Sequence, residues 1–302
     1  MRYSVIIPVY NRPDEVDELL QSLTQQSFKD FEVIVVEDGS SIPCKPVTEK
    51  YQELLDVHYY DKPNSGPGQT RNYGVERSKG EYLIILDSDC ILPEGYFLAV
   101  EEELQHEAAD AFGGPDRAHE SFTNIQKAIN YSMTSFFTTG GIRGGKKKMD
   151  KFYPRSFNMG VRQEVYQALG GFSRMRFGED IDFSIRIFKG GYTCRLFPGA
   201  WVYHKRRTDF RKFFKQVHNS GIARINLYKK YPESLKLVHL LPAAFTLGVA
   251  IFLLGTPFCP YSLLPIALYA LLVCMDSTIR NRSLSIGLYS VAAAFILSLI
   301  HI

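Results

Sequence analysis

Short apolar runs of strand length alternate with longer amphipathic segments through the first ninety residues, and this alternation constrains the fold most. Residues 4–9, 31–36 and 82–86 are apolar runs, and residues 14–26 repeat their apolar side chains at the spacing of one helix face. Strands separated by helices predict an α/β fold with a mostly parallel sheet, because parallel strands need crossover connections. The further elements that we predict in this region are a strand at 57–60 and helices over 47–55 and 69–78.

Acidic clusters come directly after two of these predicted strands. Residues 36–40 read Val-Glu-Asp-Gly-Ser, and residues 86–89 read Leu-Asp-Ser-Asp. Ligands of parallel α/β sheets bind beyond the carboxyl ends of the strands. We therefore expect a binding site along this edge of the sheet.

The Asp-Ser-Asp sequence at 87–89 is the strongest single signal. Side chains alternate along a strand, so Asp87 and Asp89 are predicted to point to one side. Two carboxylates there suit Mg²⁺ or Mn²⁺, which bind carboxylates, water and substrate phosphates. The alternative is a pair of turn-forming aspartates, which are common after strands.

Composition excludes several classes of protein. The 302 residues carry a formal net charge of +3, which gives no reason to expect a nucleic-acid partner. The five cysteines are scattered without a Cys-x-x-Cys pair, which argues against a zinc knuckle or a disulfide framework and favours a reducing compartment. The apolar start of the chain is soon interrupted by Pro8 and Asn11, so we interpret it as a buried strand and not as a signal peptide.

Long apolar stretches begin near residue 236. They cover residues 237–255, 260–275 and 284–302. The first and third lack charged side chains and are about long enough to cross a bilayer as helices. The second is shorter and contains Pro265, so it is expected either to span together with its flanks or to form half of a re-entrant hairpin. A buried helical core is the alternative, but three stretches without a polar face are hard to bury in a chain of this size.

The positive charges around these stretches predict an orientation. Ten lysines and arginines lie between residues 205 and 236, and Arg280 and Arg282 lie in the loop 276–283. Positive loops stay on the cytoplasmic side of a membrane. We therefore predict an inner-membrane or plasma-membrane protein with residues 1–236 in the cytoplasm and the C-terminus outside.

Four motifs in fixed order carry a resemblance to a known family. They are Pro8-Val-Tyr-Asn-Arg12, the acidic segments 36–40 and 87–89, and the Gly/Pro-rich segment 64–74. In this order, over most of residues 3–220, they resemble an inverting, family-2 nucleotide-sugar glycosyltransferase with the Rossmann-like GT-A fold. Together with the apolar composition after residue 236, the resemblance implies a catalytic domain at 1–236, with donor binding at about 1–115 and the acceptor side at about 116–236. A membrane region of two or three apolar helices follows at 237–302.

The resemblance also implies a role for individual side chains in binding the donor and a metal ion. Tyr10 would pack on the nucleobase, Asp38 would contact its edge, and Asp87 would face the ribose. Asp89 would bind a divalent cation, Mn²⁺ or Mg²⁺, with His204 completing the metal site. The donor is expected to be a nucleotide-diphosphate sugar, most commonly a UDP-sugar among relatives. The remaining donor-side residues of the motifs are Pro8, Asn11, Arg71 and Ser88.

A second acidic cluster, Glu179-Asp180-Ile-Asp182, precedes an apparent helix at 183–189. The resemblance implies that Asp180 is the general base and that Glu179 orients the acceptor. Helix capping is the alternative, and it suits Asp182 best. Asn158 is a candidate for the wall of the sugar pocket or a turn residue, and the Gly- and Lys-rich segment 138–148 is a candidate contact for an anionic acceptor or a flexible loop.

One departure from the family concerns processivity. Polysaccharide synthases of the family carry Gln-x-x-Arg-Trp before their membrane helices, whereas Gln216 here begins Gln-Val-His-Asn-Ser-Gly. We therefore expect single sugar transfers. The apolar C-terminal region separately favours a lipid-linked or otherwise membrane-held acceptor. The alternatives are a nucleotidyltransferase, whose basic phosphate loop is missing after the first strand, and a membrane protein that binds nucleotide sugars without turnover.

Overall fold

The computed structural model describes residues 1–119, 121–139 and 152–299. The chain divides into two compact units. The first comprises Met1–Arg117 and Lys148–His204, and the second comprises Ala118–Lys147 and Lys205–Ile302. Residues 205–236 thus belong with the apolar helices, and the predicted domain boundary at residue 236 stays a prediction.

A seven-stranded sheet forms the centre of the first unit. Its strand order is β3-β2-β1-β4-β8-β6-β9. Strands β1, β2, β3 and β4 are parallel to one another, whereas β8 runs antiparallel to its neighbours β4 and β6. The mostly parallel α/β fold is therefore confirmed. The strands are β1 (Tyr3–Val9), β2 (Phe31–Asp38), β3 (Val57–Lys62), β4 (Tyr82–Leu86), β6 (Ala111–Gly113), β8 (Asn158–Arg162) and β9 (Cys194–Leu196).

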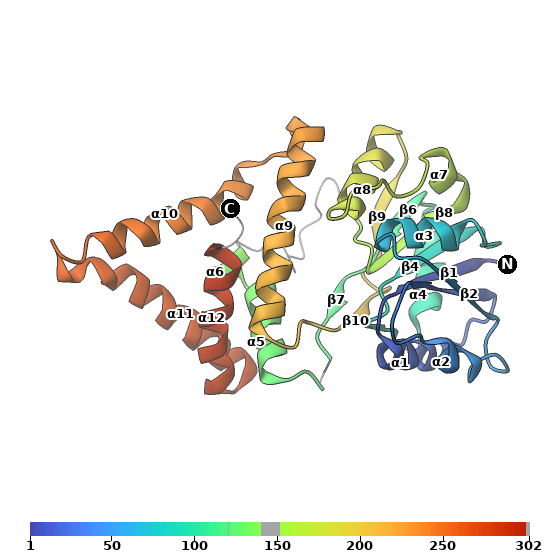
Figure 1. Cartoon of the computed structure of the whole chain (residues 1–302), viewed down its shortest axis with the longest axis horizontal. Helices are drawn as coiled ribbons and strands as arrows, with labels where there is room; N and C mark the ends of the chain where they lie inside the picture. Colours follow the sequence, from blue (N-terminus) through green and yellow to red (C-terminus); the bar gives the residue numbers. More distant parts are fainter. Residues whose placement is uncertain (120, 140–151, 300–302) are drawn as a thin grey trace. The chain divides into compact units, whose positions relative to one another are not determined.

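Helices cover both faces of this sheet (Figure 1). Alternate residues of β1 are buried on opposite faces: Val5 and Ile7 lie in the core with α1 and α4, and Ile6 lies in the core with α3, α7 and α8. Such continuous apolar strands are typical of parallel sheets buried on both sides. The helices of this unit are α1 (Pro13–Thr24), α2 (Lys45–Glu49), α3 (Pro67–Val75), α4 (Tyr96–His106), α7 (Gln163–Ala168) and α8 (Glu179–Lys189).

Helix α3 lies unusually close to the sheet. A Cβ on Gly74 would lie 2.9 Å from Ile6 Cγ2 and 3.2 Å from Val36 Cγ2. Only glycine therefore allows this approach. The helix begins at Pro67, two residues before its predicted start, and α2 ends at Glu49 although the sequence predicted a helix to residue 55.

A small second sheet, in the order β5-β10-β7, belongs to the same unit. Its strands are β5 (Cys90–Ile91), β7 (Asp116–Arg117) and β10 (Val202–His204). The antiparallel register pairs His204 with Cys90. This sheet therefore brings the predicted histidine next to the Asp-Ser-Asp motif.

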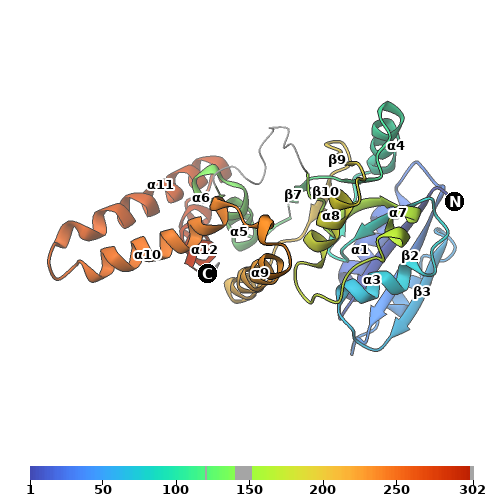
Figure 2. The same ribbon diagram turned by 90° about the horizontal axis from the view of Figure 1, so that it is seen from above.

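The second unit is helical. Close packing of α11 and α12 depends on Gly287, where a Cβ would lie 2.0 Å from Thr278 Oγ1. Ser277 and Ser290 also share a buried 2.7 Å hydrogen bond between these two helices. Figure 2 shows α10 and α11 as a helical hairpin. The elements of this unit are α5 (Asn124–Thr134), α6 (Phe136–Thr139), α9 (Phe210–Lys230), α10 (Leu241–Leu254), α11 (Leu264–Asn281) and α12 (Leu284–Leu299), with 3₁₀ turns at Pro232–Ser234, Leu237–Leu240 and Pro260–Leu263.

The apolar helices of the second unit differ in length from the predicted apolar stretches. Among the described residues, Tyr261–Asn281 is the one helical segment long and apolar enough to cross a membrane, and only 11% of its apolar window is buried. The helices at Leu241–Leu254 and Leu284–Ser298 are apolar but shorter. The stretch that we judged least able to span is thus the longest apolar helix, because it continues as a helix to Asn281.

Candidate functional site

Arg71 lies at the centre of the candidate site. Its side chain is 3% exposed and extends from α3 between two acidic motifs. One guanidinium nitrogen lies 2.7 Å from Asp87 Oδ1, and the other lies 3.0 Å from Glu179 Oε1. Ser156 Oγ accepts a further hydrogen bond of 3.1 Å. Arg71 therefore joins the end of β4 to the start of α8 and holds the two acidic motifs together. Its predicted contact with a nucleotide stays a prediction.

Asp180 lies in the first turn of α8. The helix begins at Glu179, earlier than predicted, and follows Gly178, which adopts a left-handed φ of 84°. Helix N-termini stabilise carboxylates, because the peptide dipoles point their positive end there. Arg155 Nε donates to Asp180 Oδ2 at 2.7 Å, and the amide of Ile181 donates to Oδ1 at 2.8 Å.

These contacts push the pKa values of the two neighbouring acids apart. Burial by itself would raise the pKa of Asp180, but Arg155 and the Ile181 amide outweigh it and hold this pKa below the usual range. Burial raises the pKa of Glu179, against the charge of Arg71. Acids and bases in active sites are often separated in this way. Asp180 is the member of the pair that stays ionised and can accept a proton.

Asp89 and His204 provide the candidate metal ligands. His204 Nε2 lies 3.2 Å from Asp89 Oδ1, and Phe157 stacks on the imidazole at 4.7 Å between ring centroids. One carboxylate and one imidazole on a shared edge fit a divalent cation whose other ligands are phosphate and water. Cys90 lies within the same group, but burial followed by the nearby Asp89 raises the pKa of its thiol, so it stays protonated.

Asp87 and Asp89 do not point to one side as predicted. Strand β4 ends at Leu86, and a turn follows, with the Cys90 amide donating to the Asp87 carbonyl at 3.1 Å. Asp87 faces Arg71, whereas Asp89 accepts a hydrogen bond from Arg12. Strand alternation does not apply beyond the last residue of a strand. Arg12 was not among the predicted site residues, although it belongs to the first motif.

Asp38 holds the loop between β3 and α3. Its carboxylate accepts hydrogen bonds from the amides of Ser65 and Gly66 at 2.8 and 2.9 Å and from Lys62 Nζ at 2.6 Å. Burial would raise the pKa of Asp38, but Lys62 and the loop lower it below the usual range. Asp38 thus shapes the wall of the site, and its predicted contact with a nucleobase stays a prediction.

The first motif, residues 8–12, lies at the same carboxyl-terminal edge of the sheet. Asn11 adopts a left-handed φ of 53°, and its Oδ1 accepts hydrogen bonds from the amides of Ser41 and Ile42 at 2.8 and 3.0 Å. It therefore ties the end of β1 to the loop after β2. Tyr10 is 54% exposed beside it, which leaves its ring accessible to a ligand. Pro8 lies within β1, opposite Val36.

Two other predicted residues lie inside the protein. Asn158 is 1% exposed in β8, where it accepts a hydrogen bond from the Tyr96 hydroxyl at 2.7 Å and donates one to the Ala200 carbonyl at 2.7 Å. It is therefore a buried strand residue and not a turn residue, and a contact with an acceptor stays a prediction. Ser88 is 5% exposed. Of the segment 138–148, residues 140–148 lie outside the described residues.

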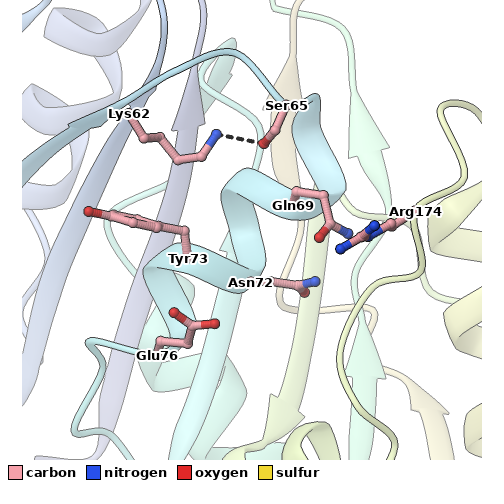
Figure 3. Close-up of a pocket in the computed structure, with 7 residues that line it drawn as sticks. All are labelled: Lys62, Ser65, Gln69, Asn72, Tyr73, Glu76 and Arg174. Atoms are coloured by element: carbon pink, nitrogen blue, oxygen red, sulfur yellow. Dashed lines mark hydrogen bonds between the residues drawn. The ribbon is translucent and has the colours of Figure 1, made fainter.

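A polar groove of about 580 Å³ lies along the outer side of α3 (Figure 3). Arg71 is on the other side of this helix, since residues three or four apart share a face. The groove meets the donor motifs at Lys62, which pairs with Asp38. Its lining residues are Lys62, Ser65, Gln69, Asn72, Tyr73, Glu76 and Arg174.

Residues 4–170, more than half of the chain, match the sequence pattern of glycosyl transferase family 2. The chain belongs to this family. The family assignment from the motifs is thereby confirmed, and an uncharacterized glycosyltransferase of Haemophilus influenzae is 30% identical over 193 residues, which are 62% of this chain and 62% of that protein. The chain spans less than two thirds of the length of the first curated relatives that it matches.

Solved structures share the GT-A-type fold. The mannosyltransferase PcManGT of Pyrobaculum calidifontis, in complex with GDP-Man and Mn²⁺, superposes with a TM-score of 0.67 at 17% identity, over 97% of this chain and 86% of that one. Residues 1–349 of TarS from Staphylococcus aureus, in complex with UDP-GlcNAc, give a TM-score of 0.54 at 18% identity, over 96% and 90% of the two chains. Identities this low establish the fold alone.

Proposed function

We propose that this glycosyltransferase moves a sugar from a nucleotide-diphosphate donor to an acceptor hydroxyl with inversion, and that it depends on a divalent cation. The observation that carries the proposal is the ion-pair chain through Arg71, which connects Asp87 of the donor motif with Glu179 beside Asp180. A donor-side acid and a proton acceptor are thereby held in one rigid group. This is the arrangement that a single displacement needs.

Asp180 is the general base of the proposed reaction. Because Arg155 holds it as a carboxylate, it accepts the proton of the acceptor hydroxyl while that oxygen attacks the anomeric carbon. The attack comes from the side opposite the leaving group, which inverts the configuration. Glu179, held by Arg71, orients the acceptor. Asp89 and His204 would hold the cation, which supplies charge neutralisation at the departing diphosphate.

The proposal does not depend on which nucleobase the donor carries. The UDP-sugar that the resemblance favours remains our first choice. The two structural neighbours were solved with different bases, GDP-Man and UDP-GlcNAc. Tyr10, with its exposed ring, is proposed to stack on the base.

A lipid-linked acceptor at a membrane is supported by the second unit. Helix α9 carries six lysines and arginines and no acidic residue. It also exposes Phe214, Ile225 and Tyr228 by 48%, 51% and 44%. Apolar side chains flanked by cations are typical of helices at the surface of an anionic membrane. Together with the apolar helix Tyr261–Asn281, this supports a membrane-bound enzyme whose first unit is cytoplasmic.

Asp180→Asn is the decisive test. The purified protein in detergent is incubated with UDP- and GDP-sugars, Mn²⁺ and a polyprenyl phosphate acceptor, and release of nucleoside diphosphate is measured. We expect transfer to fall by a factor of about 10² to 10⁴ while binding of the nucleoside diphosphate with Mn²⁺ is retained. Asp14→Asn, an exposed aspartate on α1, is the matched control. Binding without any turnover by the unmodified protein would overturn the proposal in favour of a binding protein.

A further inference from the structure

The amino-terminal rim of the main sheet carries a second group of metal-binding side chains. Glu32 lies near the start of β2, Asp56 directly precedes β3, and His58 is the second residue of β3. The parallel register pairs Ile34 with His58, so Glu32, His58 and Asp56 project from the same face of the sheet. Glu32 and Asp38 are six positions apart along β2, which places this rim about 20 Å from the candidate active site.

The ligand atoms of this group converge. His58 Nε2 lies 3.1 Å from Asp56 Oδ1 and 3.8 Å from Glu32 Oε2, and the three ligand atoms lie within 4.8 Å of one another. Ligands at about 2.0 to 2.1 Å from a tetrahedral zinc ion are about 3.3 Å apart. The two separations from His58, 3.1 and 3.8 Å, lie within about 0.5 Å of this spacing, and the third pair lies within 4.8 Å.

Glu32 supplies an independent sign that a cation belongs here. Its side chain is 0% exposed, and its Oε1 accepts hydrogen bonds from Ser4 Oγ and the Lys79 amide, both at 2.6 Å. Its Oε2, which faces His58, has no hydrogen-bond donor among the described residues. A buried carboxylate oxygen is costly unless a hydrogen bond or a positive charge compensates it.

We propose that Glu32, Asp56 and His58 form a binding site for a divalent transition-metal ion, with Zn²⁺ as the best match. Zn²⁺ binds both imidazole nitrogen and carboxylate oxygen, whereas Mg²⁺ and Ca²⁺ select oxygen ligands. The side chains of His58 and Asp56 are 36% and 51% exposed, so the cluster lies at the surface of the unit, while His58 Nε2 and Glu32 Oε2 themselves are covered. The bound ion neutralises the Glu32 carboxylate. It also links the edge strand β3 to β2 through shared metal ligands.

The test uses the full-length, metal-stripped protein and Zn²⁺ alone, without a nucleotide. His204→Ala is introduced first, so that the candidate active-site metal position does not contribute. We expect this variant to bind one zinc ion on the β2–β3 rim and to gain on the order of 5 °C in melting temperature at a 100-fold excess over Kd. Co²⁺ in place of Zn²⁺ should give the visible absorption of a tetrahedral site.

Adding His58→Ala should abolish both the zinc-dependent gain and the cobalt spectrum. Asp56→Asn, at an exposed position, should weaken binding about tenfold or more and does not rely on a buried substitution. Adding His106→Ala instead, an exposed histidine of α4, should leave zinc binding unchanged. The proposal is overturned if the His204→Ala variant shows no zinc-dependent gain, or if His58→Ala does not remove it.

Discussion

The two rims of the main sheet hold buried acids in different ways. At the carboxyl rim, four acids each face a lysine or arginine, whereas at the amino rim Glu32 faces a hydroxyl, an amide and a histidine. Arginine and lysine stay charged at neutral pH, so the first rim is fixed as a set of ion pairs. A neutral histidine can act as a metal ligand, so the second rim is the one that we propose to bind a metal ion. The four pairs are Asp38–Lys62, Asp87–Arg71, Asp89–Arg12 and Asp180–Arg155.

Arg71→Met should break the carboxyl rim most severely. The variant removes the cation that Asp87 and Glu179 share. The Arg71 side chain is only 3% exposed, so water cannot readily replace it. Removing one partner of a buried ion pair costs about 3 to 5 kcal/mol. Chemical unfolding should show this loss of stability. Adding Glu179→Gln should recover part of it, and a purely additive double variant would contradict the ion-pair account.

Asp89→Asn and His204→Ala should each weaken Mn²⁺ binding in the presence of a nucleoside diphosphate, by about 100-fold. A metal site with so few protein ligands loses much of its affinity with either one, since even supporting residues contribute 10- to 100-fold. Isothermal titration with Mn²⁺ measures the effect. Glu32→Gln is the contrasting variant from the other rim, and an equal loss there would erase the distinction between the rims.

Arg12→Gln should instead strengthen the binding of Mn²⁺. In the absence of a nucleotide, Arg12 neutralises Asp89, so a metal ion must compete with its guanidinium. A hydrogen bond to a charged group contributes about 1.5 to 3 kcal/mol, so the variant should bind Mn²⁺ about tenfold more tightly. Electron paramagnetic resonance of free Mn²⁺ can follow this titration. Weaker binding would show that Arg12 supports the metal site and does not compete with it.

Arg155→Met should move the acid limb of the pH–rate profile upward by about one pH unit. In the unmodified protein the pKa of Asp180 lies below its usual range, so the proposed base stays ionised at mildly acidic pH. Without Arg155, burial dominates and the pKa rises, so protonation inactivates the base at a higher pH. The dependence of kcat/KM on pH measures the shift, and an unmoved acid limb would remove Asp180 as the titrating base.

His58→Ala should have the smallest effect on stability when metal is absent. The half-exposed imidazole contributes about 1 kcal/mol or less to the free energy of unfolding. Glu32 keeps its bonds to Ser4 and Lys79. Chemical unfolding in a chelating buffer checks this, and a loss as large as that of Arg71→Met would show that the two rims are held alike.

The sequence predicted the parts of the fold that depend on local patterns. The strand at 82–86 has the predicted bounds, because a continuous apolar run ends at the first aspartate. The family assignment came from four short motifs at strand ends and is confirmed by the match over residues 4–170.

Other features depend on contacts between distant residues, which no local pattern reveals. Strand β8 pairs Asn158 with Leu86, and Arg12 pairs with Asp89, across more than seventy residues in each case. The pairing of Arg155 with Asp180 likewise depends on where two separate segments fold. The candidate metal and base residues were therefore predicted by type, whereas Arg12 and Arg155, which pair with Asp89 and Asp180, were not.

The position of β8 limits how the first unit can move. This strand is hydrogen-bonded on one side to β4 of the donor half and on the other to β6, and its Asn158 amide is held at both ends. The segments 1–117 and 152–204 therefore cannot separate without breaking the backbone hydrogen bonds that pair β8 with β4 and β6. If the first unit closes over a substrate in the proposed reaction, the movement within this unit would come from its connecting loops.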